Sequence, residues 1–459
     1  MLNRRAFLTR SAALAGAAAC AVPAQAKSGA KSLFDQIAFR GSIDASEFGL
    51  SANALDDQSR VFQKMLEKAA LRDTPVFLPP GTYPVSNITL PDRVRLQGVP
   101  GATRIVYTGN GHLFAGENSR LVSLDGIDFD GQNRWLSEQV QALIDLRRVS
   151  EVSMRECAVT GSGKTAIALE KCGGLVSQSR LSGAQDYALY AVESSGLTIT
   201  GNRVEDCGNG GILIHRWQDG EDGTLVSGNR VSRMGATRGG TGQYGNGINL
   251  FRARGVTVTG NRVSDCAFSA IRANSSSNMI AQGNQCVRSG ETALYAEFAF
   301  EGAMIAGNIV DGAANGISVV NSNEGGRLAT VQGNIVRNLR REGPYAADAP
   351  GFGAGITVEA DTAVTGNTVE KAPLFGLQLG WGPFLRNVSA TGNVMRACGT
   401  GIAVSVVEGA GKTVISGNVI DSAKNGGIIG HRWAEAATGE LDGEAGAFPH
   451  LTVERNAIS

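Results

Sequence analysis

The segments Ile199-Thr200-Gly201-Asn202-Arg203-Val204 and Val226-Ser227-Gly228-Asn229-Arg230-Val231 are copies of one unit, Val/Ile-x-Gly-Asn-x-Val. The unit recurs, with some variation, at steps of 23 to 33 residues. A second element, Gly-Ile-x-Val, follows each Asn by roughly eight to thirteen residues, or by more where a loop intervenes. The glycines of the first unit are Gly201, Gly228, Gly260, Gly283, Gly307, Gly333, Gly366, Gly392 and Gly417.

Both elements alternate apolar and polar residues with a period of two, as short β-strands do. Gly and Asn border them, and these residue types adopt the positive φ of tight turns. Short strands at a period of about 25 residues, with no helix between them, cannot form separate hairpin domains. They can stack as the coils of a parallel β-helix, each about 4.8 Å from the next. The sequence therefore predicts an all-β, single-stranded parallel β-helix of about 14 coils.

The repeated Asn is expected to form a ladder inside the coils. Its side-chain carbonyl would accept a hydrogen bond from the amide of the next coil, which satisfies turn backbone that would otherwise be orphaned. Cys207, Cys266 and Cys398 each follow their Asn by five residues, and Met234 holds that place in another coil. A position filled by Cys or Met predicts an inward core column rather than a metal site.

The composition agrees with this architecture. Gly accounts for 62 of 459 residues and only 6% are aromatic, which suits narrow coils bounded by tight turns. The 42% of hydrophobic residues is too high for a disordered chain. Lys and Arg total 42, and Asp and Glu total 42, so the overall charge gives no reason to expect nucleic acid or an anionic membrane as a partner.

The first 26 residues have the pattern of an export signal. Arg4-Arg5 precedes Phe7-Leu8, an Ala-rich stretch follows, and Ala24-Gln25-Ala26 forms a small-residue cleavage site. We therefore predict a twin-arginine signal peptide at 1–26 and a periplasmic or secreted mature chain. No later segment has the length and apolarity of a membrane span, so no membrane insertion is expected after signal removal.

The segment Val76-Phe77-Leu78-Pro79-Pro80-Gly81-Thr82-Tyr83 resembles the opening coil of the pectin-lyase-like superfamily of right-handed parallel β-helices. In that superfamily a short helix caps the N-terminal end, and residues 56–66 have the matching pattern of apolar residues. The resemblance implies an N-terminal segment with a capping helix at 27–75 and a right-handed β-helix domain at 76–459. The export signal and the repeat together also resemble a bacterial family of twin-arginine-translocated repeat proteins.

One outward face is the candidate site. In Gly-Ile-x-Val-x the Ile and Val point inward, so the two x positions point outward. Two insertions, at 235–245 and 339–353, lie four coils apart on one edge of the same sheet. They would stand about 19 Å apart, and we expect them to bracket a groove for an extended chain molecule. Polar and aromatic residues of the groove floor are Asn249, Phe251, Arg272, Asn274, Tyr295 and Glu297.

Uronate chemistry is the reaction that this floor suggests. Arg272 would clamp or neutralise a carboxylate and so acidify the neighbouring C–H. Tyr295, or His215 from the flanking coil, would transfer the proton, and Glu297 would orient the base or bind a cation. The alternative is that all of these are ordinary solvated strand residues, because outward positions must be polar in any case. The substrate-binding candidates, of which the aromatic ones would stack on sugars, are Asn249, Phe251, Asn274, Glu359, Gln378 and Trp381.

Three aspartates form a further candidate cation site in the sequence. Asp125, Asp128 and Asp130 would place two carboxylates on one strand face, where Ca²⁺ could bind. A solvated strand edge is the alternative. No other cofactor and no metal site are expected, because the cysteines lack the Cys-x-x-Cys spacing of zinc or redox sites.

The sequence His-Arg-Trp at 215–217 recurs at 431–433, eight coils further along the chain. Each copy follows a Gly-Gly-Ile strand and precedes an acidic, Gly-rich loop. We expect the arginine to stack on the tryptophan and fix a structural corner. A pair of sugar-binding sites is the alternative.

Two main functions follow from these patterns, and a cofactor carrier is a third that only the export route suggests. The first is an exported enzyme that acts on an acidic polysaccharide by lyase-type elimination or C5-epimerisation. The second is a non-catalytic carbohydrate-binding or envelope scaffold protein of the periplasm. The acidic motifs of polygalacturonases and the Asp-Pro-His-Asp run of alginate epimerases do not occur in this sequence, so neither of those two activities is specifically indicated. A polysaccharide or oligosaccharide is the expected partner in both cases.

Overall fold

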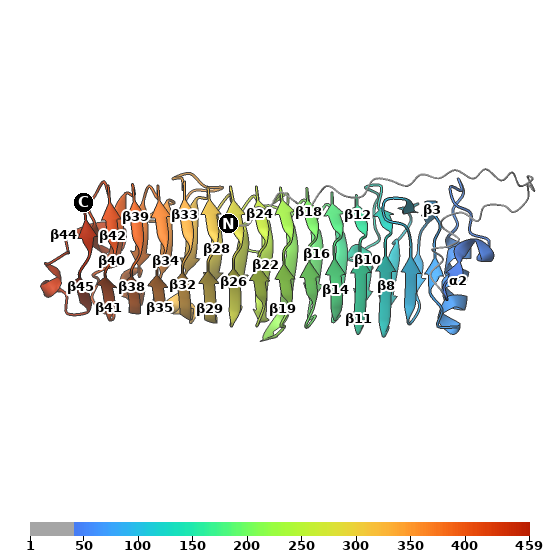
Figure 1. Cartoon of the computed structure of the whole chain (residues 1–459), viewed down its shortest axis with the longest axis horizontal. Helices are drawn as coiled ribbons and strands as arrows, with labels where there is room; N and C mark the ends of the chain where they lie inside the picture. Colours follow the sequence, from blue (N-terminus) through green and yellow to red (C-terminus); the bar gives the residue numbers. More distant parts are fainter. Residues whose placement is uncertain (1–40) are drawn as a thin grey trace, which may run out of the picture. The chain divides into compact units, whose positions relative to one another are not determined.

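Residues 41–459 are the part of the chain that this computed structural model describes, and they form a right-handed parallel β-helix of about 14 turns (Figure 1). The predicted fold class is therefore confirmed. Most coils contribute one strand to each of three sheets, which we call A, B and C in the order in which a coil visits them. The predicted signal peptide at 1–26 lies outside the described residues.

The three sheets contain 16, 15 and 15 strands. Sheet A runs from β1 (Ile43–Asp44) to β45 (Leu451–Glu454), and sheet B runs from β3 (Gly81–Val85) to β46 (Ala457–Ile458). Sheet C, which carries the candidate site, consists of β4 (Ile88–Leu90), β7 (Phe114–Glu117), β10 (Ala142–Arg147), β13 (Thr165–Glu170), β16 (Tyr187–Val192), β19 (Gly210–Glu221), β22 (Asn246–Arg254), β25 (Ile271–Asn274), β28 (Thr292–Glu297), β31 (Asn315–Val319), β34 (Ala354–Val358), β37 (Phe375–Leu379), β40 (Thr400–Ser405), β43 (Ile428–Arg432) and β44 (Glu435–Glu440).

Equivalent positions of the repeat stack on one another from coil to coil. Ile212 of β19 pairs with Ile248 of β22, and Ile248 pairs with Ile271 of β25. All three side chains are buried, as the inward position of Ile in the Gly-Ile element requires. Side chains of adjacent residues in a strand point to opposite faces. The residues next to these Ile residues therefore point outward and form columns with the same register.

A ladder of Asn side chains runs inside the corner between sheets A and B. Nδ2 and the backbone N of Asn229 both donate to Oδ1 of Asn261, at 3.0 and 2.9 Å. Nδ2 of Asn229 also donates to the backbone O of Ile199 at 2.9 Å. Each side-chain carbonyl thus accepts from the preceding coil, whereas we expected it to accept from the following one. The direction is reversed because the backbone N–H at this turn points toward the following coil. The ladder residues are Asn202, Asn229, Asn261, Asn284, Asn308, Asn334, Asn367, Asn393, Asn418 and Asn456.

The two recurring glycines are needed for different reasons. Gly228, beside a ladder Asn, has a φ of 62°, a left-handed conformation that side chains disfavour. Gly211 of the second element makes a close approach instead, because a Cβ at this position would lie 2.3 Å from the backbone O of Gly247 in the next coil. Gly therefore recurs at both positions of the repeat for steric reasons.

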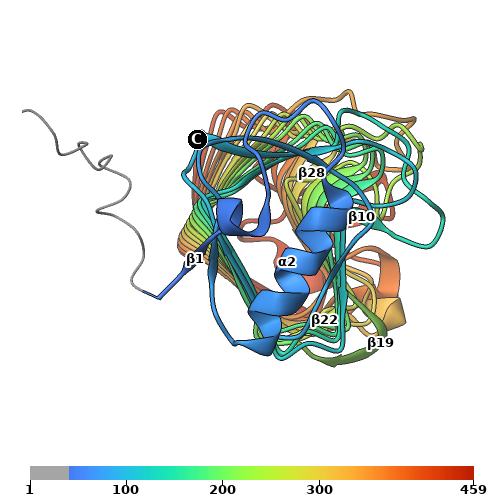
Figure 2. The same ribbon diagram turned by 90° about the vertical axis from the view of Figure 1, so that its right-hand side faces the viewer.

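The two ends of the solenoid are closed differently. The helix α2 (Ser59–Leu71) lies across the N-terminal opening (Figure 2) and buries Phe62, Met65 and Leu66 against the first coils. Strand β1 pairs with β2 (Val76–Phe77), so sheet A includes residues that precede the helix and the expected domain start at 76. At the C-terminal end, β44 folds back antiparallel onto β43. Within residues 41–459, no helix combines the length and apolarity needed to cross a bilayer.

The cysteines are core residues, as predicted. Cys207, Cys266 and Cys398 are 1–3% exposed, and Met234 is equally buried. Burial raises the pKa of the Cys207 thiol to about 11 and that of Cys266 to about 12, so these thiols stay protonated at neutral pH and are poor metal ligands.

The Asn ladder should contribute strongly to stability. Asn367→Ala removes the acceptor of the backbone N and of one Nδ2 hydrogen of Asn334, and the side-chain donor to the carbonyl of Val331, inside the core. At about 1–3 kcal/mol for each unsatisfied group, we expect the free energy of unfolding in urea to fall by about 3 kcal/mol or more. Thr368→Ala, an exposed position next in sequence, is the matched control and should cost under about 1 kcal/mol. Equal losses in the two variants would refute a stabilising ladder.

Candidate functional site

The candidate residues stack in register on the outer face of sheet C. Asn249 of β22 pairs with Arg272 of β25, and Arg272 pairs with Tyr295 of β28. In the next outward column, Phe251 pairs with Asn274, and Asn274 pairs in turn with Glu297 of β28. The expected columns are thus present, but the side chains are far less exposed than a solvated face would be, because loops cover them.

Arg272 forms a closed ion pair with Glu297. Its Nε and Nη2 donate to the two carboxylate oxygens of Glu297 at 2.7 and 2.9 Å, and Nδ2 of Asn274 donates to the same carboxylate at 3.0 Å. The guanidinium lies 4.9 Å from the ring centre of Tyr295. The side chains of Arg272 and Glu297 are 7% and 2% exposed. Arg272, Tyr295 and Glu297 therefore converge, but the carboxylate held by Arg272 is the protein's own.

Glu291 ties both insertions to this pair. Its carboxylate accepts a hydrogen bond from Thr241 of the 235–245 loop at 3.0 Å and one from the hydroxyl of Tyr345 in the 339–353 loop at 2.6 Å. Nη1 of Arg272 donates to Thr241 at 2.6 Å and lies 3.3 Å from Glu291. The loops thus meet over Arg272 instead of standing as separate walls. This arrangement corrects the expected continuous groove and divides the floor into two pockets.

The first pocket, which we call the His215 pocket, has a volume of about 590 Å³. It lies over β16, β19 and β22 beneath the 235–245 loop. Four of the candidate residues line it: His215, Asn249, Phe251 and Asn274. The other lining side chains are mostly aromatic or polar, and they include Tyr190, Arg216, Trp217, Gln243 and Tyr244.

His215 is the floor of this pocket and is itself packed between rings. Tyr190 and Phe251 meet it edge to face, with ring centres 5.4 and 5.7 Å away. Burial lowers the pKa of His215 to about 4, so the imidazole is neutral at neutral pH. Its Nε2 has no hydrogen-bond partner in the described part of the chain.

The second pocket, which we call the Tyr295 pocket, has a volume of about 250 Å³. Tyr295, Glu359, Gln378 and Trp381 line it, so the remaining binding candidates gather here. Burial raises the pKa of both the Tyr295 phenol and the Glu359 carboxyl. At neutral pH the phenol is therefore a hydrogen-bond donor rather than a base. Tyr345 of the 339–353 loop also lines this pocket, and sequence reasoning missed the acidic side chains Glu291 and Asp348.

The repeated His-Arg-Trp motifs are held by contacts other than the expected stacking. Arg216 pairs with Glu193 of the preceding coil at 3.3 Å, and Arg432 pairs in the same way with Glu408 at 2.6 Å. The tryptophans pack elsewhere: Lys171 lies over Trp217, and Trp433 meets Trp381 at 5.5 Å. The cavity beside the second copy is only about 10 Å³, too small for a sugar.

The three candidate Ca²⁺ ligands do not converge on one point. Asp130 pairs with Arg104 and accepts a hydrogen bond from the backbone N of Gln132. Burial raises the pKa of Asp125 and Asp128, which disfavours their charged forms. No group of three or more His, Cys, Asp or Glu side chains placed to hold a metal occurs within residues 41–459.

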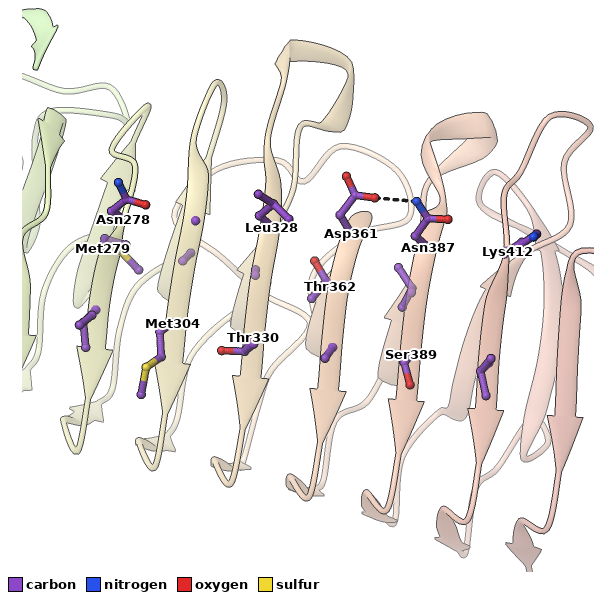
Figure 3. Close-up of a pocket in the computed structure, with 17 residues that line it drawn as sticks. Asn278, Met279, Met304, Leu328, Thr330, Asp361, Thr362, Asn387, Ser389 and Lys412 are labelled. Atoms are coloured by element: carbon purple, nitrogen blue, oxygen red, sulfur yellow. Dashed lines mark hydrogen bonds between the residues drawn. The ribbon is translucent and has the colours of Figure 1, made fainter.

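A third hollow lies on a different face and was not expected. It has a volume of about 840 Å³ and runs across the outer surface of sheet A, from Met279 to Val414 (Figure 3). Its lining is mainly apolar and includes Met304 and Leu328, and Asp361 accepts a hydrogen bond from Asn387 beside it. None of the candidate residues of sheet C lines this hollow.

The burial of His215 predicts a pH-dependent stability. Its pKa in the folded protein lies below the unfolded value of about 6.5, so its contribution is complete above pH 6.5 and is lost as the pH falls toward 4. His215→Phe, which suits the aromatic stack, should flatten this decline by up to about 3 kcal/mol, measured by urea unfolding at pH 7 and pH 4.5. Tyr190→Phe is the control and should leave the slope unchanged. A His215→Phe slope equal to that of the wild type would contradict the prediction.

The sequence of this chain matches one family model, described as a right-handed β-helix region, over residues 117–241 and 165–336. A search of curated proteins finds no match.

Several solved structures are similar in fold. The N-terminal fragment of bacteriophage phi29 gene product 12 is 14% identical with a TM-score of 0.45, over 87% of this chain and 67% of that one. The A-module of the Azotobacter vinelandii mannuronan C-5 epimerase AlgE6 is 15% identical with a TM-score of 0.47, over 91% and 99%. The Streptococcus pneumoniae surface adhesin PfbA is 13% identical with a TM-score of 0.43, over 85% and 92%. At these values the similarity assigns neither activity nor ligand. The family model shows that the central part of this chain, residues 117–336, is similar to the right-handed β-helix family.

Proposed function

We propose that this protein binds a polysaccharide in the His215 pocket on the outer face of sheet C. The lining of the pocket supports the proposal, because Tyr190, Trp217 and Phe251 present aromatic surface and Asn249 and Asn274 present amides. Aromatic rings pack on the apolar faces of sugars, and amides bond their hydroxyls. The volume of about 590 Å³ lies within the range of pockets that enclose small ligands.

A binding role without catalysis agrees best with the contacts on this face. A substrate carboxylate could reach Arg272 only by displacing Glu297, which would leave a buried charge unpaired at a cost of about 3–5 kcal/mol. His215 is enclosed by two rings and has little room to move a proton. We therefore propose that Arg272 and Glu297 are positioning residues that hold the two loops over the sheet. The proposed setting is the periplasm or the cell exterior, reached through the export signal predicted at 1–26.

The Tyr295 pocket supports a second candidate, lyase or C5-epimerase action on a uronate. A protonated phenol and a carboxyl with a raised pKa line one small cavity, and paired groups of this kind are frequent where protons are transferred. In this proposal Glu359 accepts the proton at C5 and Tyr295 donates one from the other side or to the leaving oxygen. Gln378 and Trp381 would hold the sugar ring.

Trp217 should be the strongest single contributor to binding. It is 53% exposed and lines the His215 pocket, so part of its ring is accessible to a sugar. After a panel of neutral and acidic oligosaccharides has identified a ligand, Trp217→Ala should raise its Kd by about tenfold or more in calorimetric titration. Trp135→Ala, which removes a tryptophan that is 62% exposed and outside this pocket, is the control. Equal effects of the two substitutions, or no binding across the panel, would refute the binding proposal.

Proton transfer at C5 can be tested separately from binding. The mature protein is incubated in deuterium oxide with a panel of polyuronates, and ultraviolet absorbance of unsaturated products and deuterium at C5 are both recorded. The enzymatic candidate predicts one of these signals, its loss in Tyr295→Phe, and its retention in Tyr187→Phe, which lies outside the Tyr295 pocket. If the wild type gives neither signal, the enzymatic candidate is excluded and the binding proposal stands alone.

A further inference from the structure

Four arginines stack in register on the outer face of sheet B. Arg180 of β15 (Arg180–Ser182) pairs with Arg203 of β18 (Arg203–Glu205), and Arg203 pairs with Arg230 of β21 (Arg230–Ser232). Arg230 pairs with Arg262 of β24 (Arg262–Ser264). All four are exposed and lie along the middle of the solenoid, where β18 and β24 are labelled in Figure 1. We call this row the arginine strip. At the spacing of neighbouring strands it is about 14 Å long.

One end of the strip is organised by a buried carboxylate. Glu205, whose side chain is 4% exposed, bonds Arg180 at 2.9 Å, Arg203 at 3.0 Å and Arg233 at 2.9 Å. Arg233 also pairs with Asp206 at 2.6 Å. Two carboxylates thus serve three guanidinium groups, which orients the arginines and leaves an excess of positive charge. The side chains of Arg180 and Arg203 remain 60% and 65% exposed.

The other end of the strip is open. Arg262 donates to the uncharged amide of Gln285 at 2.8 Å, and Arg230 forms no ion pair with any residue of the described part of the chain. Other arginines on the same sheet have acidic partners, as Arg337 has in Asp311 at 2.8 Å. A row of exposed guanidinium groups that outnumber their carboxylates is suited to an external anion.

Small hydroxyl residues flank the strip on both sides. Thr200, Ser227 and Thr259 form an outward column of sheet A across the Gly-Asn turn. Ser232 and Ser264 follow the arginines on their own strands. The outward positions of β15, β18, β21 and β24 contain no aromatic side chain. The surface around the strip thus offers hydrogen bonds to hydroxyl groups but no stacking platform.

We propose that the arginine strip binds a linear polysaccharide that carries an acidic group on successive sugars, laid along the solenoid axis. The arginines repeat about every 4.8 Å, roughly one sugar ring for each coil, so successive acidic groups can meet successive guanidinium groups. The strip lies on a different sheet from the His215 pocket. The proposal therefore stands whether or not that pocket binds a sugar.

The shape of the strip favours this partner over other polyanions. Proteins that bind single-stranded nucleic acid combine positive charge with aromatic side chains on which the bases stack, and the strip has none. An anionic lipid surface is a plane, whereas the strip is one arginine wide, with a hydroxyl column on one side and a column of serines and the arginine-paired Glu205 on the other. A narrow charged row with hydrogen-bonding flanks matches a single polysaccharide chain.

The test compares the wild type with a triple variant, Arg203→Ser, Arg230→Ser and Arg262→Ser. Binding to polygalacturonate is measured by affinity electrophoresis and calorimetry over a series of salt concentrations, with neutral dextran and single-stranded oligothymidylate as comparison ligands. We expect the triple variant to bind polygalacturonate about tenfold or more weakly, with a shallower dependence on salt. The matched control replaces Arg327, Arg386 and Arg396 by Ser, which removes the same charge from arginines already paired with carboxylates, and it should change the Kd less than twofold.

The triple variant could also lose binding because it misfolds, so a second variant is chosen that should bind more tightly. Glu205→Gln removes the carboxylate but keeps its shape, and we expect it to bind polygalacturonate several-fold more tightly than the wild type. Loss of binding in the triple variant together with gain in Glu205→Gln supports the proposal. Unchanged binding in the triple variant, no binding by the wild type, or tighter binding of oligothymidylate than of polygalacturonate would overturn it. The His215 pocket is tested separately, through its own ligand and Trp217→Ala, so a failure of one site is distinguishable from a failure of the other.

Discussion

The hydrogen bonds between successive ladder Asn residues are the constraint on which the other features depend. Each Asn fixes its turn against the coil before and the coil after, as Asn229 does through Ile199 and Asn261. Because the coils from Asn202 to Asn456 are held at the same corner, the residue at a given offset from the Asn stacks on its equivalent in the next coil. Columns of like side chains, such as the buried Ile row and the arginine strip, are direct consequences of this register.

Loops change what an outward column does. On bare strands, polar outward positions face water and cost nothing, but the insertions at 235–245 and 339–353 turn the same positions into an interior. Arg272 then needs carboxylates of the protein, and Glu297 and Glu291 supply them. Two long loops over a sheet therefore require a buried polar network beneath them. The two pockets lie on either side of this network.

Three features could be predicted from the repeat: the fold, the inward Cys and Ile columns, and the residues of the outward columns. The reason is that side chains alternate along a strand, so the position of a residue in the repeat fixes whether it points inward or outward. Contacts between loops were beyond such reasoning. Thr241 and Tyr345 meet at Glu291 only because both loops bend across the sheet, and nothing in the spacing fixes that bend. The reversed ladder polarity likewise depends on how the peptide is oriented at the turn. By contrast, the arginine strip is visible in the recurring Gly-Asn-Arg-Val sequence.

Overall neutrality is a poor guide to the partners of a solenoid. The 42 basic and 42 acidic residues cancel over the whole chain, yet in 0.15 M salt charges further apart than about 8 Å are largely screened from one another. A ligand that lies along a few coils therefore responds to the charges of those coils. On sheet C the guanidinium of Arg272 is paired with the carboxylates of Glu297 and Glu291. It is therefore not available to a ligand, which favours an uncharged sugar in the His215 pocket. On sheet B, Glu205 contacts three arginines, and Arg230 forms no ion pair within residues 41–459. The same neutral chain therefore presents a locally positive row.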